Sequence, residues 1–290
     1  MPSPHRLRGA LFILCSALLF YLATFFVRLA STEFQVPGSW YMLARFLLGL
    51  PLFFFFMRRQ GGGVKSSGWL LMRAVFNVVA VIFFLYAAHF GSVVNANVLN
   101  MTYPAFVALL SPVFIGEKSS YLTWLAVGAA IAGSAIITTG GKSLDFRAAD
   151  ILGLASGITA GIGVMSLRQI RKTDSTFSVL YYTFLLGTVV SLILVLCETW
   201  GLPALPQALH SYRFWWLVML SGLCGVVGQW VFTYGFAYVG AVEGSILSTT
   251  RILIALLFGI TYFHESFTWA SAAGALLILF SNVALAVRRS

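Results

Sequence analysis

Long apolar runs follow one another along the whole chain, separated by short polar segments. Ten of the runs approach the length of a bilayer-spanning helix, which needs about 20 mostly apolar residues. They cover residues 9–29, 39–57, 69–89, 92–115, 121–140, 150–169, 177–197, 214–238, 241–263 and 268–287. Polar and apolar residues do not alternate within the runs, which are also too long for barrel strands. The pattern predicts an all-α integral membrane protein with ten transmembrane helices.

The second half of the chain repeats features of the first. Residues 91–133 are echoed by residues 240–281, and in both copies an apolar run closes with a glutamate, Glu117 or Glu265. The sequence Phe-Leu-Leu-Gly at residues 46–49 recurs at residues 184–187. Because five helices per half is an odd number, the second half should enter the membrane from the opposite side. We therefore expect two inverted five-helix repeats, residues 1–145 and 146–290, that depend on each other to fold.

Composition and charge also indicate a membrane protein. Of the 290 residues, 60% are hydrophobic and only 9% are charged, too few to cover a soluble protein of this size. If the N-terminus is cytoplasmic, twelve basic residues lie on that side of the membrane and four on the other. The twelve are Arg6, Arg8, Arg58, Arg59, Lys65, Arg73, Lys118, Arg168, Arg171, Lys172, Arg288 and Arg289, and the four are Arg28, Lys142, Arg147 and Arg213.

This asymmetry follows the positive-inside rule. It predicts a multi-pass protein of the bacterial inner membrane with both termini in the cytoplasm. A formal net charge of +10 could suggest a nucleic-acid partner in a soluble chain. Here the basic residues lie at membrane edges rather than on one patch interleaved with aromatic residues, so we expect no nucleic-acid binding.

Several short motifs resemble the drug/metabolite transporter superfamily and, within it, the ten-helix EamA-type transporters. They are Tyr103-Pro104, Gly116-Glu117 and Gly133 in the first half, Glu265, Gly274 and Ser281 in the second, and Arg45-Phe46. The resemblance covers essentially the whole chain and implies transport of a small metabolite. Two positions depart from it. Ala126 stands where the second half has Gly274, a glycine of the family pattern. Ile252 stands where the family's second repeat often has a proline, so the proline that would kink the span 241–263 is missing.

Two arginines lie inside predicted spans, where a charged side chain costs at least ~3 kcal/mol unless it is paired or hydrated. Arg251 lies close to the middle of the span 241–263. It is either a substrate-binding residue, half of a structural ion pair, or nearer the membrane edge than the span suggests. Arg45 lies in the span 39–57, and there the structural interpretation is preferred because the resemblance places an arginine at this position whatever is carried. A guanidinium group presents a fork of donors that suits a carboxylate or phosphate.

Polar residues recur at matching places in the spans 92–115 and 241–263. A shift of 148 residues aligns Asn97 with Ser245, Asn100 with Ser248 and Tyr103 with Arg251. A spacing of three keeps each set on one flank of its helix, which is a poor neighbour for lipid. These side chains either line a central cavity and bind a polar molecule, or form hydrogen bonds between helices.

Glu243 is the acidic residue expected nearest to this cavity. It lies at the start of the span 241–263, eight residues before Arg251. It could bind a substrate ammonium group or a coupling proton, but we prefer a role at the helix N-terminus, where negative charge is favourable. The resemblance associates the spans 69–89 and 214–238 with the cavity wall. It thereby adds Tyr86, Gln229, Trp230 and Tyr234 as further candidates, although Trp230 is better explained as a packed aromatic residue.

Missing motifs narrow the function. The sequence has no Gly-x-x-x-x-Gly-Lys-Ser/Thr nucleotide loop, metal-ligand cluster or nucleophile elbow. We therefore expect no cofactor, no metal and no enzymatic activity. The prediction is a secondary active transporter that exports amino acids or related carboxylated metabolites by alternating access, driven by the substrate gradient or by proton exchange. Carboxyl-rich metallophores would also fit.

Two alternatives stay open within the transporter class. One is the import of a charged metabolite such as S-adenosylmethionine, and the other is broad drug export, against which Arg251 in the cavity would argue. The expected partners are the lipid bilayer and a small-molecule substrate. Because one chain contains both repeats, the protein could work as a monomer or as a homodimer.

Overall fold

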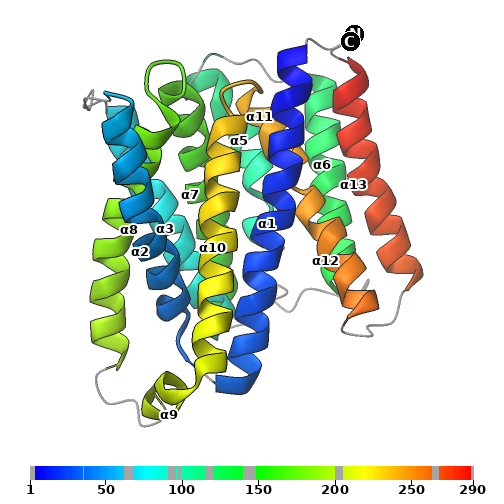
Figure 1. The fold of residues 1–290 in the computed structure, drawn as a ribbon. Helices are drawn as coiled ribbons and strands as arrows, with labels where there is room; N and C mark the ends of the chain where they lie inside the picture. Colours follow the sequence, from blue (N-terminus) through cyan, green and yellow to red (C-terminus); the bar gives the residue numbers. More distant parts are fainter. Residues whose placement is uncertain are drawn as a thin grey trace.

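The computed structural model describes residues 4–34, 36–61, 68–90, 96, 99–114, 116, 120–139, 148–199, 205–262 and 268–288. Within them, every regular element is a helix (Figure 1). The first half contains α1 (Pro4–Phe34), α2 (Gly38–Arg59), α3 (Gly68–Phe90), α5 (Tyr103–Phe114) and α6 (Tyr121–Thr139). The second half contains α7 (Ala148–Ile170), α8 (Thr176–Thr199), α9 (Leu205–His210), α10 (Tyr212–Gly235), α11 (Ala241–Leu247), α12 (Thr250–Thr261) and α13 (Trp269–Arg288).

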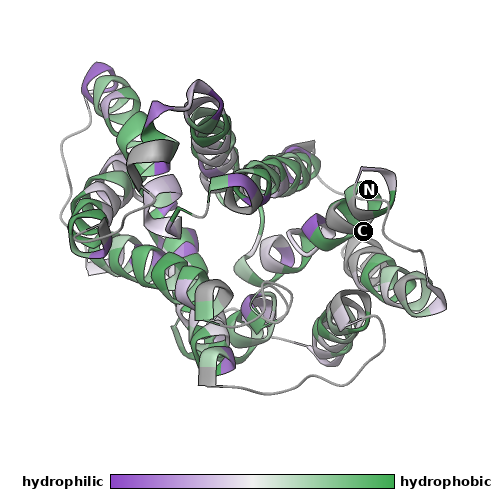
Figure 2. Cartoon of the chain, turned by 90° about the horizontal axis from the view of Figure 1, so that it is seen from below, coloured by the Kyte–Doolittle hydropathy of each residue, from purple (hydrophilic) through white to green (hydrophobic). Residues whose placement is uncertain are grey.

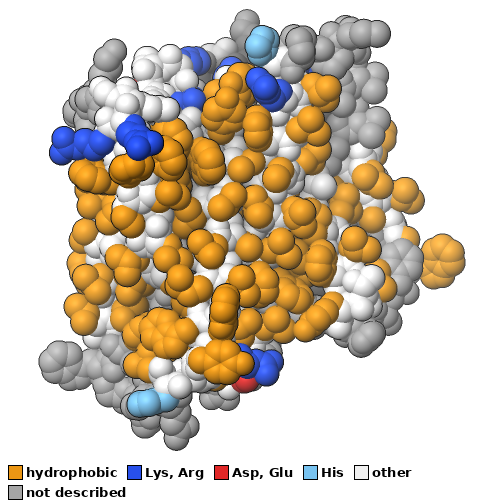
Figure 3. All heavy atoms as spheres, viewed as in Figure 1, with side chains coloured by type: hydrophobic (Ala, Val, Ile, Leu, Met, Phe, Trp, Pro, Cys, Tyr) orange, Lys and Arg blue, Asp and Glu red, His pale blue; other side chains and the backbone are white. Residues whose placement is uncertain are grey.

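Six of the described helices are long and apolar enough to cross a bilayer, namely α1, α2, α3, α7, α8 and α10. Large apolar side chains such as Leu11, Leu192 and Trp216 are exposed. Hydrophobic side chains cover much of the surface visible in Figure 3, and most of the visible Lys and Arg lie along its upper edge. The start of α1 and the end of α13 lie at that same end of the bundle (Figure 1). The chain is a multi-pass membrane protein.

Two predicted spans are interrupted instead of continuous. In the span 92–115, a turn at residues 101–102 precedes α5, which begins at Tyr103. In the span 241–263, a turn at residues 248–249 separates α11 from α12. Under the shift of 148 residues, the first turn corresponds to residues 249–250, so the two breaks coincide to within one residue.

The second break forms without a proline at position 252. The hydroxyl groups of Ser245, Ser248 and Thr249 each donate to the backbone carbonyl oxygen three residues earlier. Such local hydrogen bonds offer the backbone an alternative to the regular helix. The sequence offers them in place of the proline that is absent from this repeat.

Helices from the two halves pack in pairs. The extensive contacts join α1 to α10, α3 to α7, α2 to α8 and α6 to α13, and the bundle is seen along its axis in Figure 2. In the α2–α8 pair, the ring of Phe46 packs against Gly187 and the ring of Phe184 packs against Gly49. These four residues are the first and last of the two Phe-Leu-Leu-Gly segments. The repeated segment thus forms a reciprocal contact between the halves.

Gly133 allows α6 and α13 to approach closely, because a Cβ atom there would lie 2.5 Å from the carbonyl oxygen of Gly274. Gly133→Ala should therefore destabilise the protein by about 1–3 kcal/mol through overpacking, measured as a lower apparent melting temperature in detergent. Gly128→Ala, on the same helix, is the control, because its Cβ would meet no described atom within 4 Å. Both substitutions gain the same helix propensity, so equal melting temperatures would contradict the close contact.

Candidate functional site

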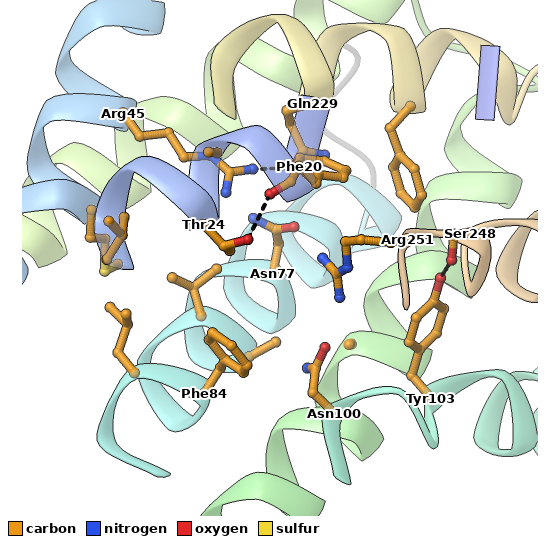
Figure 4. Close-up of a pocket in the computed structure, with 18 of the residues that line it drawn as sticks. Phe20, Thr24, Arg45, Asn77, Phe84, Asn100, Tyr103, Gln229, Ser248 and Arg251 are labelled. Carbon is orange, nitrogen blue, oxygen red and sulfur yellow. Dashed lines mark hydrogen bonds between the residues drawn. The ribbon is translucent and has the colours of Figure 1, made fainter. Parts of the chain in front are cut away.

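A cavity of about 230 Å³ lies in the interior of the bundle. Its wall is formed by α1, α2, α3, α7 and α10 together with the two helix breaks that precede α5 and α12. The polar lining includes three arginines and three amides, which are Arg45, Arg73, Arg251, Asn77, Asn100 and Gln229. Figure 4 labels all of them except Arg73. None of the described lining residues is Asp or Glu. The cavity wall is therefore rich in hydrogen-bond donors and cationic.

Arg251 lies in the first turn of α12, directly after the break. Its Nη2 atom is 3.4 Å from the Sδ atom of Met101, and a thioether is only a weak acceptor. In the part of the chain that the structure describes, no carboxylate forms an ion pair with it. Arg251 lines the cavity wall. The interpretation of Arg251 as a substrate-binding residue therefore stays a prediction that this position allows.

The two breaks add positive charge to the same place. Both α5 and α12 begin at the cavity, because Tyr103 and Arg251 in their first turns line it. The N-terminal end of a helix carries a partial positive charge. In discontinuous transporter helices such ends point at anionic groups. The helix ends and the arginines therefore favour the same kind of ligand.

Arg45 makes contacts with neighbouring helices, but one of its N–H donors has no partner among the described residues. Its Nη2 atom donates to Oε1 of Gln229 at 2.8 Å, and its guanidinium lies 5.2 Å from the ring centroid of Phe20. Gly225 makes room for it, since a Cβ there would lie 2.8 Å from Cδ of Arg45. The Nε atom is nevertheless buried without a hydrogen-bond partner. Arg45 thus has structural contacts, as preferred from the sequence, and also lines the cavity.

Arg73 is a cavity residue that the sequence analysis missed. The charge count placed it among the basic residues at the cytoplasmic ends of the spans, whereas in the structure only 3% of its surface is exposed and its side chain lines the cavity. The Nε atom of Arg73 and the Nδ2 atom of Asn77 are both buried without hydrogen-bond partners. Their spacing of four residues, which puts them on one face of α3, was the available signal. Gly163 of α7 allows close packing here, since its Cβ would lie 3.2 Å from Nη1 of Arg73.

The polar residues at the two breaks both line the cavity and connect helices. Asn100, Tyr103 and Ser248 are part of the cavity wall (Figure 4). The hydroxyl of Tyr103 lies within hydrogen-bonding distance of the hydroxyl of Ser248 and is 3.2 Å from the carbonyl oxygen of Ser245. Asn100 Nδ2 donates to Ser156 Oγ at 3.0 Å. The two interpretations of these residues are therefore compatible.

Two other candidates, Ser245 and Trp230, are not part of the described cavity wall, and a third lies outside the described residues. The Ser245 hydroxyl is buried and donates to the carbonyl oxygen of Val242. Trp230 is 38% exposed and packs beside Phe177, in keeping with a packed aromatic residue. Asn97, the partner of Ser245 in the repeat alignment, lies outside the described residues.

Two tyrosines also lie away from the cavity, each in its own hydrogen bond. Tyr86 donates to Oε1 of Glu198 at 2.8 Å. The hydroxyl of Tyr234 accepts from the hydroxyl of Tyr238 at 3.0 Å. Neither side chain belongs to the cavity wall, so both serve contacts between or within helices.

Glu243 forms an ion pair instead of facing the cavity. It lies in the first turn of α11 and is 8% exposed. Its Oε1 atom is 2.9 Å from Nε of Arg6 in the first turns of α1. The preferred location at a helix N-terminus is confirmed, and the ion pair also joins α11 to α1.

Known proteins similar to this chain are membrane transporters. Residues 7–139 and 147–287 each match the EamA-like transporter family. A riboflavin transporter of Vibrio cholerae serotype O1 is 24% identical over 82% of this chain and 78% of its own length. The pseudopaline exporter CntI of Pseudomonas aeruginosa is 23% identical over 74% of each chain. One crystal structure shares the fold, with a TM-score of 0.78 at 15% identity over 97% of this chain and 98% of the other.

Proposed function

The chain belongs to the EamA-like transporter family, and from this premise we propose that it is a secondary active transporter of the bacterial inner membrane. Its proposed activity is the export of amino acids or related carboxylated metabolites by alternating access. The observation that carries the proposal is Arg251, which faces a cavity whose described wall contains no Asp or Glu. A carboxylate fits the fork of a guanidinium group with two parallel hydrogen bonds. Export agrees with the name of one similar protein, the pseudopaline exporter CntI.

The proposed architecture is ten transmembrane helices in two inverted repeats, residues 1–145 and 146–290, in a monomer or homodimer. In it, α11 and α12 together count as one broken helix, and the span 92–115 as another. Exchanging the two halves would turn the α1–α10 pair into the α7–α3 pair, and would leave α2–α8 and α6–α13 as they are. The reciprocal contacts of Phe46 with Gly187 and of Phe184 with Gly49 follow the same exchange. These pairings support the inverted repeat.

Alternating access is supported by the different states of the two ends of the bundle. The cavity extends toward the end of α1 and the start of α2, where Val27, Gly38 and Leu85 line it. At the opposite end, the pair of Arg6 with Glu243 joins α1 to α11. We assign that end to the cytoplasm because the basic residues gather there (Figure 3). Protonation of Glu243 would remove the charge that holds this pair, which makes Glu243 the candidate for proton coupling.

The two alternatives are less compatible with the cavity. At about 230 Å³, it is smaller than the roughly 300–1,000 Å³ of sites for drug-sized ligands, which disfavours broad drug export. Three arginines would repel the sulfonium group of S-adenosylmethionine. A small metabolite with a carboxylate avoids both difficulties.

Counterflow into proteoliposomes tests the proposed function. Vesicles preloaded with an unlabelled compound are offered the same compound with a label, across a panel of acidic, neutral and cationic metabolites. We expect saturable accumulation of carboxylated compounds in vesicles with the protein and none in vesicles without it. Accumulation of cationic compounds alone would overturn the proposal.

A further inference from the structure

The three guanidinium groups of the cavity form one positive cluster. Arg45, Arg73 and Arg251 line the same small space. The described cavity wall has no acidic residue to compensate them. Even a single uncompensated charge is unfavourable at membrane depth, so the cluster calls for negative charge from a ligand.

The unsatisfied atoms of the cavity specify what that ligand must offer. The Nε atoms of Arg45 and Arg73 and the Nδ2 atom of Asn77 are buried and have no hydrogen-bond partner among the described residues. Buried polar atoms are satisfied in the great majority of cases. All three atoms are N–H donors, so the missing partner is a set of acceptor oxygens. Figure 4 shows the amide of Asn77 between the guanidinium groups of Arg45 and Arg251.

The number of charges sets the class of ligand. One carboxylate satisfies one guanidinium fork, so a singly charged anion would leave two of the three arginines uncompensated. We infer that the substrate is a small organic anion with at least two negative charges, either a dicarboxylate or a phosphate monoester. Arg251 binds one charged oxygen group, and Arg45 and Arg73 bind the remaining charge. This inference rests on the proposed transport activity; a dicarboxylate would narrow the proposed substrate class, and a phosphate monoester would replace the carboxylate by another oxyanion.

Binding of charge-matched probes to the purified protein in detergent tests the inference. Succinate is compared by calorimetric titration with succinamate, which has nearly the same shape and one charge less. Glycerol 3-phosphate is compared in the same way with its methyl diester, which also has one charge less. Since a charge-assisted hydrogen bond is the stronger kind, we expect at least about tenfold tighter binding of the dianion in one of the two pairs. The preferred pair identifies the oxyanion.

Variants of Arg73 test whether the arginine cluster binds the second negative charge of the ligand. Arg73→Gln should reduce the preference for the dianion to about threefold or less, whereas Arg73→Lys should keep most of it because the charge remains. Arg213→Gln, at an exposed arginine outside the cavity, should leave the preference unchanged. The ratio of the two dissociation constants in a probe pair is compared only between proteins whose melting temperature matches that of the wild type. A misfolded variant is thereby left out of the comparison.

Two outcomes would overturn the inference. They are equal affinities within both pairs of the wild-type protein, and no binding of either dianion. The proposed function fails in a different way, when the preferred dianion binds to the protein but does not accumulate by counterflow in proteoliposomes. A wild-type preference that survives in Arg73→Gln would remove Arg73 from the site.

Discussion

Arg251→Ala is expected to lower the counterflow rate at limiting substrate by at least about 100-fold. A hydrogen bond to a charged group contributes about 1.5–3 kcal/mol, and a guanidinium fork forms two with a carboxylate. The loss of both corresponds to about 3–6 kcal/mol, or at least about two powers of ten in affinity. The melting temperature should change little, because no described carboxylate loses an ion-pair partner. The measurement is initial counterflow in proteoliposomes that contain equal amounts of protein.

Two matched variants are needed as controls. One tests whether positive charge alone is enough at position 251, and the other tests whether loss of any arginine lowers transport. Arg251→Lys keeps the charge but loses the planar fork, so its rate should lie between those of the wild type and Arg251→Ala. Arg213 forms an exposed pair with Glu33, 67% of its side chain being accessible, and such pairs contribute little. Arg213→Ala should therefore transport at the wild-type rate. If Arg251→Ala transported as fast as Arg213→Ala, Arg251 would have no part in substrate binding.

The long helices could be predicted because length and composition alone decide whether a segment can cross a bilayer. The spans for α2, α3, α7 and α8 agree with the structure to within a few residues at each end. The breaks could not be predicted in this way, since hydropathy does not register local hydrogen bonds. At residues 245–249 the hydroxyl groups of serine and threonine compete with the helix. The residues around this turn remain apolar enough to be read as one continuous run.

Which residues face the cavity was predictable only in part. Arg45, Arg251 and Asn100 were predicted as candidates because charged and amide groups are costly in lipid, and all three line the cavity. The resemblance also made Tyr86 and Trp230 candidates, but neither side chain lines the cavity. A transmembrane helix that is apolar on every side, such as α10, carries no stripe that fixes its rotation. Only its packing against neighbouring helices decides which side chain points inward.

Arg73 shows a second limit of sequence-based prediction, which concerns whether a side chain is buried inside the bundle. It lies near the start of an apolar run, where a basic residue is normally read as an interfacial anchor. Its burial depends on the tight packing of α3 against α7, a contact between segments about 90 residues apart in the sequence. No local pattern reports such a contact. The positive-inside count needs only the other basic residues, so the predicted orientation does not depend on Arg73.

The combined substitution of Gly49 and Gly187 by alanine is expected to be the most destabilising change in the bundle that leaves the cavity intact. A Cβ at Gly49 would lie 2.3 Å from a ring carbon of Phe184, and one at Gly187 would lie 2.5 Å from a ring carbon of Phe46. Both rings are fully buried at 0% exposure and contact each other edge to face at 5.2 Å between centroids. Neither ring can turn away without displacing the other.

Each alanine alone should cost about 1–3 kcal/mol through overpacking, and the pair should depart from additivity because both act on the same two rings. The measurement is the apparent melting temperature in detergent of the wild type, both single variants and the double variant, with Gly128→Ala as the control for helix propensity. Phe184→Leu replaces the ring that Gly49 contacts by a smaller side chain. It should partly restore the melting temperature of Gly49→Ala and raise that of Gly187→Ala by less. Additive effects no larger than that of Gly128→Ala would mean that α2 and α8 do not interlock. The repeated Phe-Leu-Leu-Gly segment would then lose its structural explanation, in which the glycine of each copy makes room for the phenylalanine of the other.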